Sequence, residues 1–151
     1  MLSSVIGAVA EAMEPLLRAY HSASDVEQQY FQSVIDRMVR HLEYFVVPGV
    51  SVAANEVASR HGLGDLRRRP WGDRRTRGLV KWEHHPPVAD ILKSLFGLDE
   101  PTPEVIQPIL MFAGVNWVSL EEEASLPKHN RGPDLGAPYA DITMLHNCER
   151  G

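Results

Sequence analysis

The sequence predicts a mostly helical α+β protein, with an N-terminal helical segment followed by a small unit in which a β-hairpin precedes a helix (a ββα-like unit). Three features predict this class. Apolar residues recur at helical intervals over residues 1–61. Two short runs, 79–84 and 115–118, contain residues that favour strands. Ser-x-x-Glu capping boxes precede two predicted helices. With 151 residues, 44% of them hydrophobic, the chain has the size of one folded domain.

The first predicted helix covers residues 3–22. Its apolar side chains recur every three or four positions, as they do along one face of a helix: Ile6, Val9, Met13, Leu16, Leu17 and Tyr20. Pro15 lies within this run. Because proline cannot donate to the helical hydrogen-bond ladder, we expect a break or a kink there.

The second predicted helix, residues 24–46, has the clearest boundaries. Ser24 and Glu27 match a capping box, a continuous apolar face follows, and Pro48-Gly49 ends the helix. A shorter helix is predicted from about residue 51 to 60. These amphipathic helices need a surface to cover, because such faces are stabilised mainly by tertiary burial. That surface is another helix of the segment, the C-terminal half or a second chain.

Residues 62–78 form a basic connection rich in glycine, arginine and proline, which predicts an irregular, exposed segment. Residues 60–81 carry eight Lys and Arg against two acids, a net charge of +6. The flanks are acidic, at -4 for residues 1–59 and -7 for 82–151, and the whole chain is at -5. Such a basic stretch either holds phosphates or pairs with the acidic flanks. Trp71 within it either stacks on a base or anchors the loop.

The C-terminal segment, residues 79–151, is predicted to hold the two strands, 79–84 and 115–118, with a helix over 88–97 inserted between them. A capping box at Ser119 starts a further helix, which we expect to end near Pro127. Three prolines predict a connection before the second strand: Pro101, Pro103 and Pro108.

Adjacent histidines followed by proline, His84-His85-Pro86, end the first predicted strand. Successive side chains of a strand point to opposite sides, so the two rings can take different roles. One imidazole can bind a metal while the other takes a proton from water, because its ordinary pKa lies near neutrality. Glu83 can join them as a ligand or orient a ring. The alternative is that the pair is only structural.

The order of these residues resembles that of the HNH, or His-Me finger, endonucleases, particularly the variants found as bacterial polymorphic toxins. A strand ends in His-His-Pro, a second strand carries Gly114-Val115-Asn116, and a helix is followed by Leu126-Pro127-Lys128-His129. The resemblance covers at most residues 79–139. It implies a hairpin and a helix that hold one divalent cation. This sequence departs from the family in its inserted helix and in the proline just before His129.

Residue by residue, the resemblance implies that His84 and His129 are metal ligands, that His85 is the general base and that Asn116 orients it. Tyr139 stands where toxin-type members often have Tyr or Asn. The cation would be Mg, Mn, Ni or Zn. From their charge and position we expect four arginines to hold the phosphate backbone: Arg67, Arg68, Arg74 and Arg75.

The preferred function is therefore metal-dependent hydrolysis of nucleic-acid phosphodiesters, with DNA favoured over RNA as the substrate. One alternative is a non-catalytic helical binding or regulatory protein. Another is a metal-dependent enzyme that acts on a small molecule through the same histidines. The N-terminal helices are candidates for a homodimer or for contact with an immunity-type partner. If the arginines face the same side as His85, a polyanionic substrate is favoured; if they pair with the acidic flanks, it is disfavoured.

We expect a cytoplasmic protein that does not span a membrane, because no apolar run is long enough and no secretory signal is visible. Export of a toxin by a dedicated system would leave the same pattern. The lone Cys148 excludes an internal disulfide.

Overall fold

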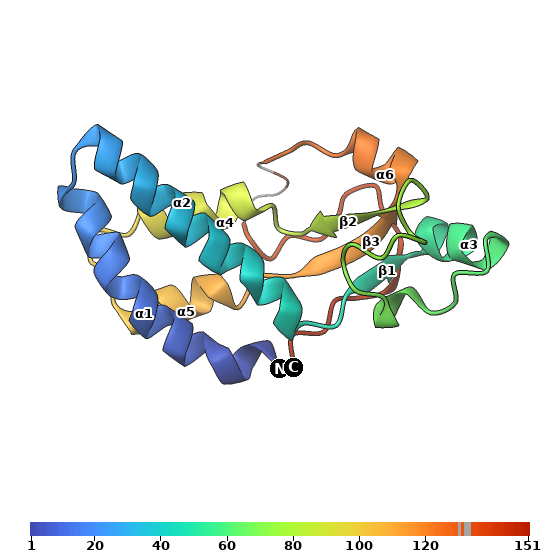
Figure 1. Ribbon diagram of the computed structural model, residues 1–151, viewed down its shortest axis with the longest axis horizontal. Helices are drawn as coiled ribbons and strands as arrows, with labels where there is room; N and C mark the ends of the chain where they lie inside the picture. Colours follow the sequence, from blue (N-terminus) through green and yellow to red (C-terminus); the bar gives the residue numbers. More distant parts are fainter. Residues whose placement is uncertain (130, 132–133) are drawn as a thin grey trace.

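The computed structural model describes residues 1–129, 131 and 134–151. It confirms a mostly helical α+β protein with one small sheet (Figure 1). The helices are α1 (Leu2–Ser22), α2 (Asp25–His41), α3 (Val52–Arg60), α4 (Val88–Phe96), α5 (Pro103–Leu110) and α6 (Leu120–Ser125), with short 3₁₀ turns at Leu42–Phe45 and Leu66–Arg68. The strands are β1 (Gly49–Ser51), β2 (Val80–His84), β3 (Val115–Ser119) and β4 (Met144–His146).

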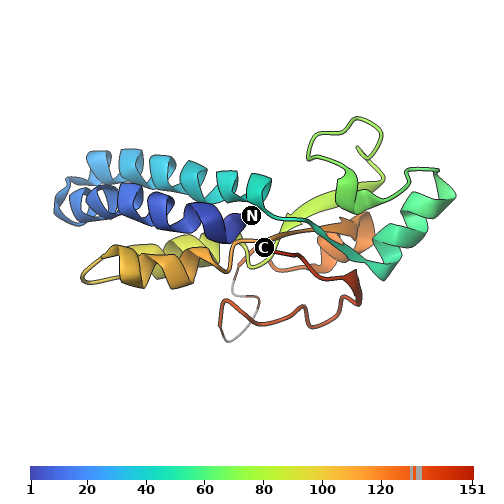
Figure 2. The same cartoon turned by 90° about the horizontal axis from the view of Figure 1, so that it is seen from below.

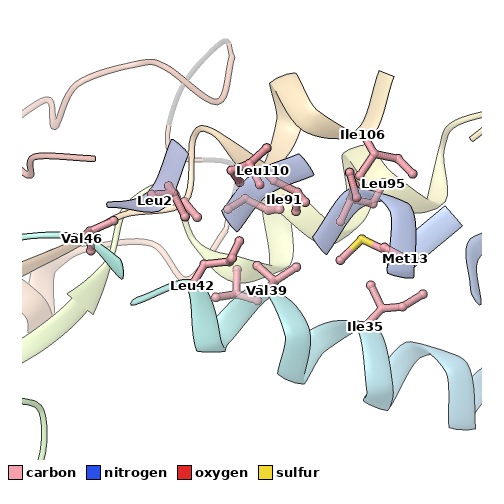
Figure 3. Packing of buried hydrophobic residues seen from close by; sticks show 14 of the residues in the cluster. Leu2, Met13, Ile35, Val39, Leu42, Val46, Ile91, Leu95, Ile106 and Leu110 are labelled. Atoms are coloured by element: carbon pink, nitrogen blue, oxygen red, sulfur yellow. The ribbon is translucent and has the colours of Figure 1, made fainter. Parts of the chain in front are cut away.

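Four helices, α1, α2, α4 and α5, pack together at one end of the molecule (Figures 1 and 2). Their apolar faces meet in a core to which each helix contributes (Figure 3). The N-terminal helices therefore cover each other and two helices of the C-terminal half. Among the core side chains with 2% exposure or less are Leu2, Met13, Leu17, Ile35, Val39, Leu42, Ile91, Leu95, Ile106 and Leu110.

The break expected at Pro15 does not occur, because α1 is helical from Leu2 to Ser22. A proline inside a helix removes one hydrogen bond and costs about 3 kcal/mol. The residues on either side offset that cost, since Met13 and Leu17 are fully buried in the helical core.

The second predicted helix forms as α2 and continues into the 3₁₀ turn that ends at Phe45. Its capping box is present. The backbone N–H of Ser24 donates to Glu27 Oε2 at 2.9 Å. The hydrogen bonds from the side chain and backbone of Ser24 lower the pKa of the Glu27 carboxyl. The sequence signal for this helix start is therefore confirmed in detail.

The prediction of a connection around Pro103 and Pro108 is wrong, because these residues belong to α5. Pro103 stands at the first position of the helix, where its missing N–H removes no hydrogen bond. Pro108 lies inside the helix and does remove one. Burial of Ile106 and Leu110 against the helical core stabilises this short helix.

The four strands form one sheet in the order β2-β3-β1-β4. β2 and β3 are antiparallel, β1 runs parallel to β3, and β4 is antiparallel to β1. β1 and β4 were not predicted, since each has only three residues. β1 belongs to the expected N-terminal segment and pairs with β3 of the C-terminal one. The first and third expected segments, 1–61 and 79–151, therefore share one sheet, and residues of 62–78 join both of them in the smaller core.

Strand register assigns side chains to the two faces of the sheet, because directly paired residues point to the same side. Trp82 pairs with Trp117 on one face, here called the tryptophan face. Glu83 pairs with Asn116 on the opposite face, here called the asparagine face. Figure 2 shows the basic loop after α3 on one side of the sheet and the C-terminal segment on the other. The two sides therefore have different chemical surroundings.

A second, smaller core lies on the tryptophan face, where α3 and the basic loop pack against the sheet. Its buried members are Val50, Ala54, Ala58, Leu63, Leu66, Val80 and Trp117. At the far end of β3, Ser119 caps α6 as predicted, with the N–H of Glu122 donating to Ser119 Oγ at 3.1 Å. Among the described residues, no helix combines the length and the apolar character needed to span a bilayer.

Candidate functional site

The two adjacent histidines point to opposite faces of the sheet, as the alternation of a strand requires. His84, the last residue of β2, lies on the tryptophan face with its Nε2 2.9 Å from Glu43 Oε2. This distance permits an ion pair when the ring is protonated, although the angle is not that of a hydrogen bond. Trp82 Nε1 donates to the same carboxylate oxygen at 3.0 Å. His84 therefore belongs to the contact between the sheet and the helical bundle.

Glu43 is held ionised by these neighbours. Burial alone would raise the pKa of its carboxyl, but the contacts from His84 and Trp82 outweigh burial, so the pKa is lowered. The positive charges of His84 and Arg40 act in the same direction. This carboxylate therefore remains available as the partner of His84 at neutral pH.

His85 lies on the asparagine face. Its backbone N–H donates to Gly114 O at 3.1 Å, which extends the pairing of β2 with β3 by one residue. Its ring Nε2 lies 2.8 Å from Ala137 O. A carbonyl oxygen can only accept, so we assign the hydrogen to Nε2, and the neutral ring then carries its lone pair on Nδ1. Within the described part of the chain, the buried Nδ1 has no hydrogen-bond partner.

The surroundings of His85 favour the neutral ring. Burial lowers the pKa of His85 below its ordinary value, and the positive charges of Arg131 and Arg150 lower it further. The hydrogen bond to Ala137 and the charge of Asp90 oppose this shift without reversing it. At neutral pH the ring is therefore uncharged and Nδ1 carries a lone pair, but Nδ1 is shielded from solvent, so water reaches it only when the surrounding side chains shift.

Asn116 and Tyr139 complete a three-residue cluster with His85. The Tyr139 ring stacks on the His85 ring with centroids 3.8 Å apart. Asn116, which is 5% exposed, donates from Nδ2 to the Tyr139 hydroxyl oxygen at 3.0 Å. Burial raises the pKa of Tyr139, so its hydroxyl stays protonated. Because Asn116 Nδ2 donates to the Tyr139 oxygen, the Tyr139 hydroxyl hydrogen is left to donate to a different group.

A close backbone approach positions Asn116. Gly49 of β1 pairs with Asn116 of β3, and a Cβ at Gly49 would collide with Asn116 Oδ1. The same Cβ would lie only 2.8 Å from His146 O and from Cys148 N. Glycine is therefore required here for contact rather than for an unusual backbone angle.

These residues line a pocket of about 290 Å³ on the asparagine face. Arg150 forms part of its wall, and its Nε donates to Ala113 O at 2.9 Å. Burial raises the pKa of the Cys148 thiol, which also lines the pocket, so this thiol is held protonated. The remaining lining residues are mostly apolar or small: Pro86, Phe112, Leu135, Gly136, Ala137, Pro138, Met144 and Asn147.

A buried ion pair holds the segment after α6 against the sheet beside this pocket. Arg131 Nη1 pairs with Glu83 Oε1, and the two side chains are only 9% and 13% exposed. The same nitrogen donates to His84 O at 3.2 Å. Glu83 therefore fixes a guanidinium near His85 and is not free to act as a ligand.

The two residues expected to ligate a metal are not assembled with His85. His84 points to the other face, toward Glu43. His129 is exposed and lies after the end of α6. Within the described ranges, no three His, Cys, Asp or Glu side chains converge as metal ligands. These described side chains therefore do not fit a shared cation site.

The four arginines expected to hold phosphate are not next to His85 either. Arg67 pairs with Glu149, and Arg68 lies 3.5 Å from Asp65. Arg75 is exposed and donates to Gly62 O at 3.2 Å. Arg74 is exposed. Their loop lies on the tryptophan face, across the sheet from His85 (Figure 2). This placement, with Arg67 paired to an acid of the flank, disfavours a polyanionic substrate held at His85 by these arginines.

Sequence reasoning singled out the histidine pair from its residues, and the family resemblance added Asn116 and Tyr139. It missed Arg150 and Arg131. Nothing in the local pattern of either arginine indicates a site, because each reaches His85 through the folding of the C-terminal segment. Comparisons with protein-family models, curated proteins and solved structures found no match to this chain. The geometry therefore carries the functional argument alone.

Proposed function

We propose that this protein hydrolyses phosphodiester bonds of nucleic acid, with His85 as the general base. One observation carries the proposal: His85, Asn116 and Tyr139 meet at a pocket where His85 Nδ1 has no partner in the described part of the chain. A neutral imidazole with a free ring nitrogen, held by a hydrogen bond on its other nitrogen, is the arrangement that general-base catalysis needs.

The chemistry is attack of water on phosphorus. His85 Nδ1 takes the proton of the water as its oxygen bonds to phosphorus, and the bond to the leaving oxygen then breaks. The protonated Tyr139 hydroxyl is placed to donate a hydrogen bond to a phosphoryl oxygen, with Asn116 holding it in position. Arg150 and Arg131 supply positive charge close to the base, which supports an anionic substrate.

The expected divalent cation, Mg, Mn, Ni or Zn, is tested in the cleavage assay but has no role in the step above, because the described side chains do not form a site for it. DNA remains favoured over RNA. The support for phosphate as the substrate has moved, however, from the Arg67–Arg77 loop to Arg150 in the wall of the pocket, because Arg131 is paired with Glu83 and is not among the described residues that line it. The proposal therefore requires no alignment of that loop with His85.

The test is cleavage of plasmid DNA, a single-stranded oligonucleotide and RNA with each of the four metals and with EDTA. The wild-type protein is compared with His85→Ala and with His21→Ala, a matched loss of an exposed histidine on α1. We expect cleavage by the wild type and by His21→Ala. Loss of a general base lowers the rate by about 10²- to 10⁴-fold in His85→Ala. Cleavage that survives in His85→Ala, or no cleavage under any condition, contradicts the proposal.

The apolar lining of the pocket favours a second candidate, hydrolysis of a small phosphate ester. Aryl phosphodiesters tested in the same assay separate the two. Turnover of such an ester, lost in His85→Ala and without cleavage of either nucleic acid, would favour the small-molecule enzyme. Inactivity toward all substrates would leave a binding protein.

A further inference from the structure

A second pocket, of about 300 Å³, lies on the tryptophan face between the basic loop and the sheet. All three tryptophans of the chain line it: Trp71, Trp82 and Trp117. Arg77 and Lys81 lie at the same pocket. We propose that this pocket binds an unpaired nucleobase together with its phosphate, as presented by single-stranded nucleic acid. It is distinct from the pocket at His85, and its function as a binding site does not require cleavage there.

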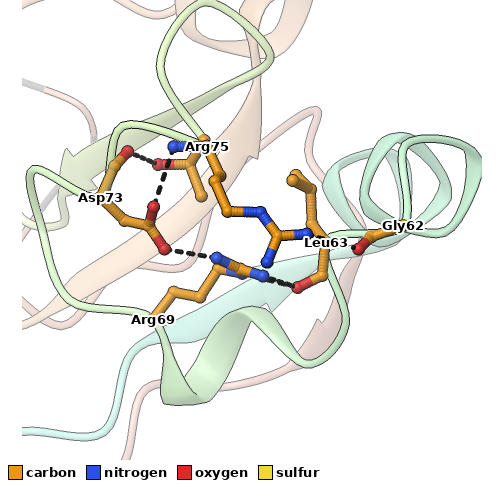
Figure 4. A network of polar contacts seen from close by, with 6 residues as sticks. Gly62, Leu63, Arg69, Asp73 and Arg75 are labelled. Atoms are coloured by element: carbon orange, nitrogen blue, oxygen red, sulfur yellow. Dashed lines mark hydrogen bonds and ion pairs between the residues drawn. The ribbon is translucent and has the colours of Figure 1, made fainter.

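The basic loop is held in place by bonds of its own. Asp73 is its centre: it pairs with Arg69, and its Oδ1 accepts from the Arg75 backbone N–H at 2.8 Å (Figure 4). Arg69 Nε also donates to Leu63 O at 2.6 Å, and Arg75 Nη2 donates to Gly62 O at 3.2 Å. These bonds join the loop to the end of α3. The loop is thus secured without the side chain of Trp71.

Trp71 is exposed beside the pocket. Its side chain is 60% exposed although the loop around it is fixed. An indole that anchors a loop is normally buried, so anchoring does not account for this one. An exposed ring beside a pocket is suited to stacking on a planar partner, and every nucleobase presents such a face.

The wall of the pocket includes the buried indole of Trp117. Trp117 is 2% exposed, and its Nε1–H has no hydrogen-bond partner in the described part of the chain. A buried donor without an acceptor is unfavourable. Nε1 is shielded from solvent, so an acceptor reaches it only when the loop or the indole shifts on binding. The carbonyl and ring-nitrogen acceptors of a base are suitable partners.

The pocket also carries positive charge at its rim. Arg67, Arg68 and Arg69 pair with acids, whereas the exposed Arg77, which lines the pocket, forms no ion pair among the described residues. Arg77 therefore places an unpaired positive charge at the rim of an aromatic pocket. This combination attracts phosphate and stacks bases without reading sequence.

The site is also placed to serve the proposed hydrolase. β2 is an edge strand of the sheet, so a flexible single strand can pass around it from the tryptophan face toward His85. A rigid duplex bends far less readily over so short a distance. The inference predicts a preference for single strands, and binding can be measured without turnover, so the two proposals fail independently.

The experiment measures binding of a fluorescein-labelled oligothymidylate by anisotropy in EDTA. It compares the wild type, His85→Ala, Trp71→Ala, Trp71→Phe and Tyr30→Ala, which removes an aromatic ring of similar exposure on α2. Loss of one base–aromatic stack weakens binding by roughly 5- to 150-fold in Trp71→Ala. Trp71→Phe should recover much of the affinity, while His85→Ala and Tyr30→Ala should bind like the wild type. Circular dichroism confirms the fold of each variant.

Two further arms identify the source of the ligand. Replacing Arg77 by Gln should reduce the slope of log K against log salt by about 0.7, the value for one phosphate that the protein no longer neutralises. Thymidine monophosphate that competes at the affinity of the oligonucleotide supports the pocket with a free nucleotide as its ligand. No binding, equal binding by Trp71→Ala and the wild type, or tighter binding of duplex than of single strand overturns the inference.

Discussion

His85 shows how its surroundings set the protonation of a single side chain. Burial and two guanidinium groups both favour the neutral ring, while one carbonyl fixes which nitrogen carries the hydrogen. Its neighbour His84 lies beside an ionised carboxylate, Glu43, on the other face of the sheet. Two adjacent residues of one type therefore have different partners because the strand separates their environments.

At the residue scale, the first prediction concerns the pKa of His85. Arg150→Gln removes a positive charge that lowers this pKa, so we expect it to rise toward its ordinary value, whereas Arg150→Lys should leave it nearly unchanged. NMR titration of the His85 ring measures both. The lowered pKa of His85 also makes the stability of the fold depend on pH. Because the pKa of His85 is lower in the folded state than in the unfolded state, the contribution of His85 to the free energy of unfolding decreases as the pH falls below about 6.5. An unchanged pKa in Arg150→Gln would contradict this account.

The parts of the site that could be predicted from the sequence are those set by residues close together in the chain. Strand alternation separates His84 from His85, and that relation is local. Asn116 shares the face of His85 only through the register of β2 against β3, in which Glu83 pairs with Asn116. The partners Glu43 and Arg150 come from distant parts of the chain, and no spacing in the sequence specifies them. The proposed ligand pair of His84 and His129 needed a register that local pattern does not determine.

At the element scale, burial overrides local signals. Pro15 and Pro108 both lie inside helices because the apolar residues around them reach the helical core. β1 is invisible in the sequence because three residues are too few for a periodic pattern, and Pro48-Gly49 was interpreted only as the end of a helix. Capping boxes at Ser24 and Ser119, in contrast, act within four residues and were predicted correctly.

The prediction at this scale compares two glycines. In Gly49→Ala the new Cβ would lie 2.8 Å from Cys148 N and would collide with Asn116, so we expect about 1–3 kcal/mol of destabilisation. Gly7→Ala, in the middle of α1, meets no atom within 4 Å and should stabilise the protein by about 0.5–1 kcal/mol. Urea denaturation measures both free energies of unfolding. Equal effects at the two positions would disprove the close contact.

At the scale of the whole molecule, the sheet connects the two cores. The helical core and the smaller core on the tryptophan face both contact Trp82 of β2. The two ends of the chain also lie together, with Leu2 N–H donating to Arg150 O at 2.9 Å (Figure 1). Contacts of this kind join segments that the sequence suggested as separate units.

We therefore predict one cooperative unfolding transition. Trp71 and Trp117 line the pocket beside the smaller core and Trp82 contacts both cores, so tryptophan fluorescence reports mainly the sheet and its smaller core, while far-UV circular dichroism reports mainly the helices. The two transitions should coincide in urea, with the same midpoint. Loss of the fluorescence signal at lower urea than the helical signal would show that the two cores unfold separately.

The most direct test of the central claim is the pH dependence of phosphodiester cleavage by the wild-type protein. A general base must be unprotonated, so we predict that kcat/KM falls at acid pH with a pKa below 6.5, the ordinary value for histidine, because the His85 pKa is lowered. In Arg150→Gln that acidic limb should move to higher pH, in step with the titration of the His85 ring. A profile without an acidic limb, or one whose limb is unchanged in the residual activity of His85→Ala, would show that His85 is not the base.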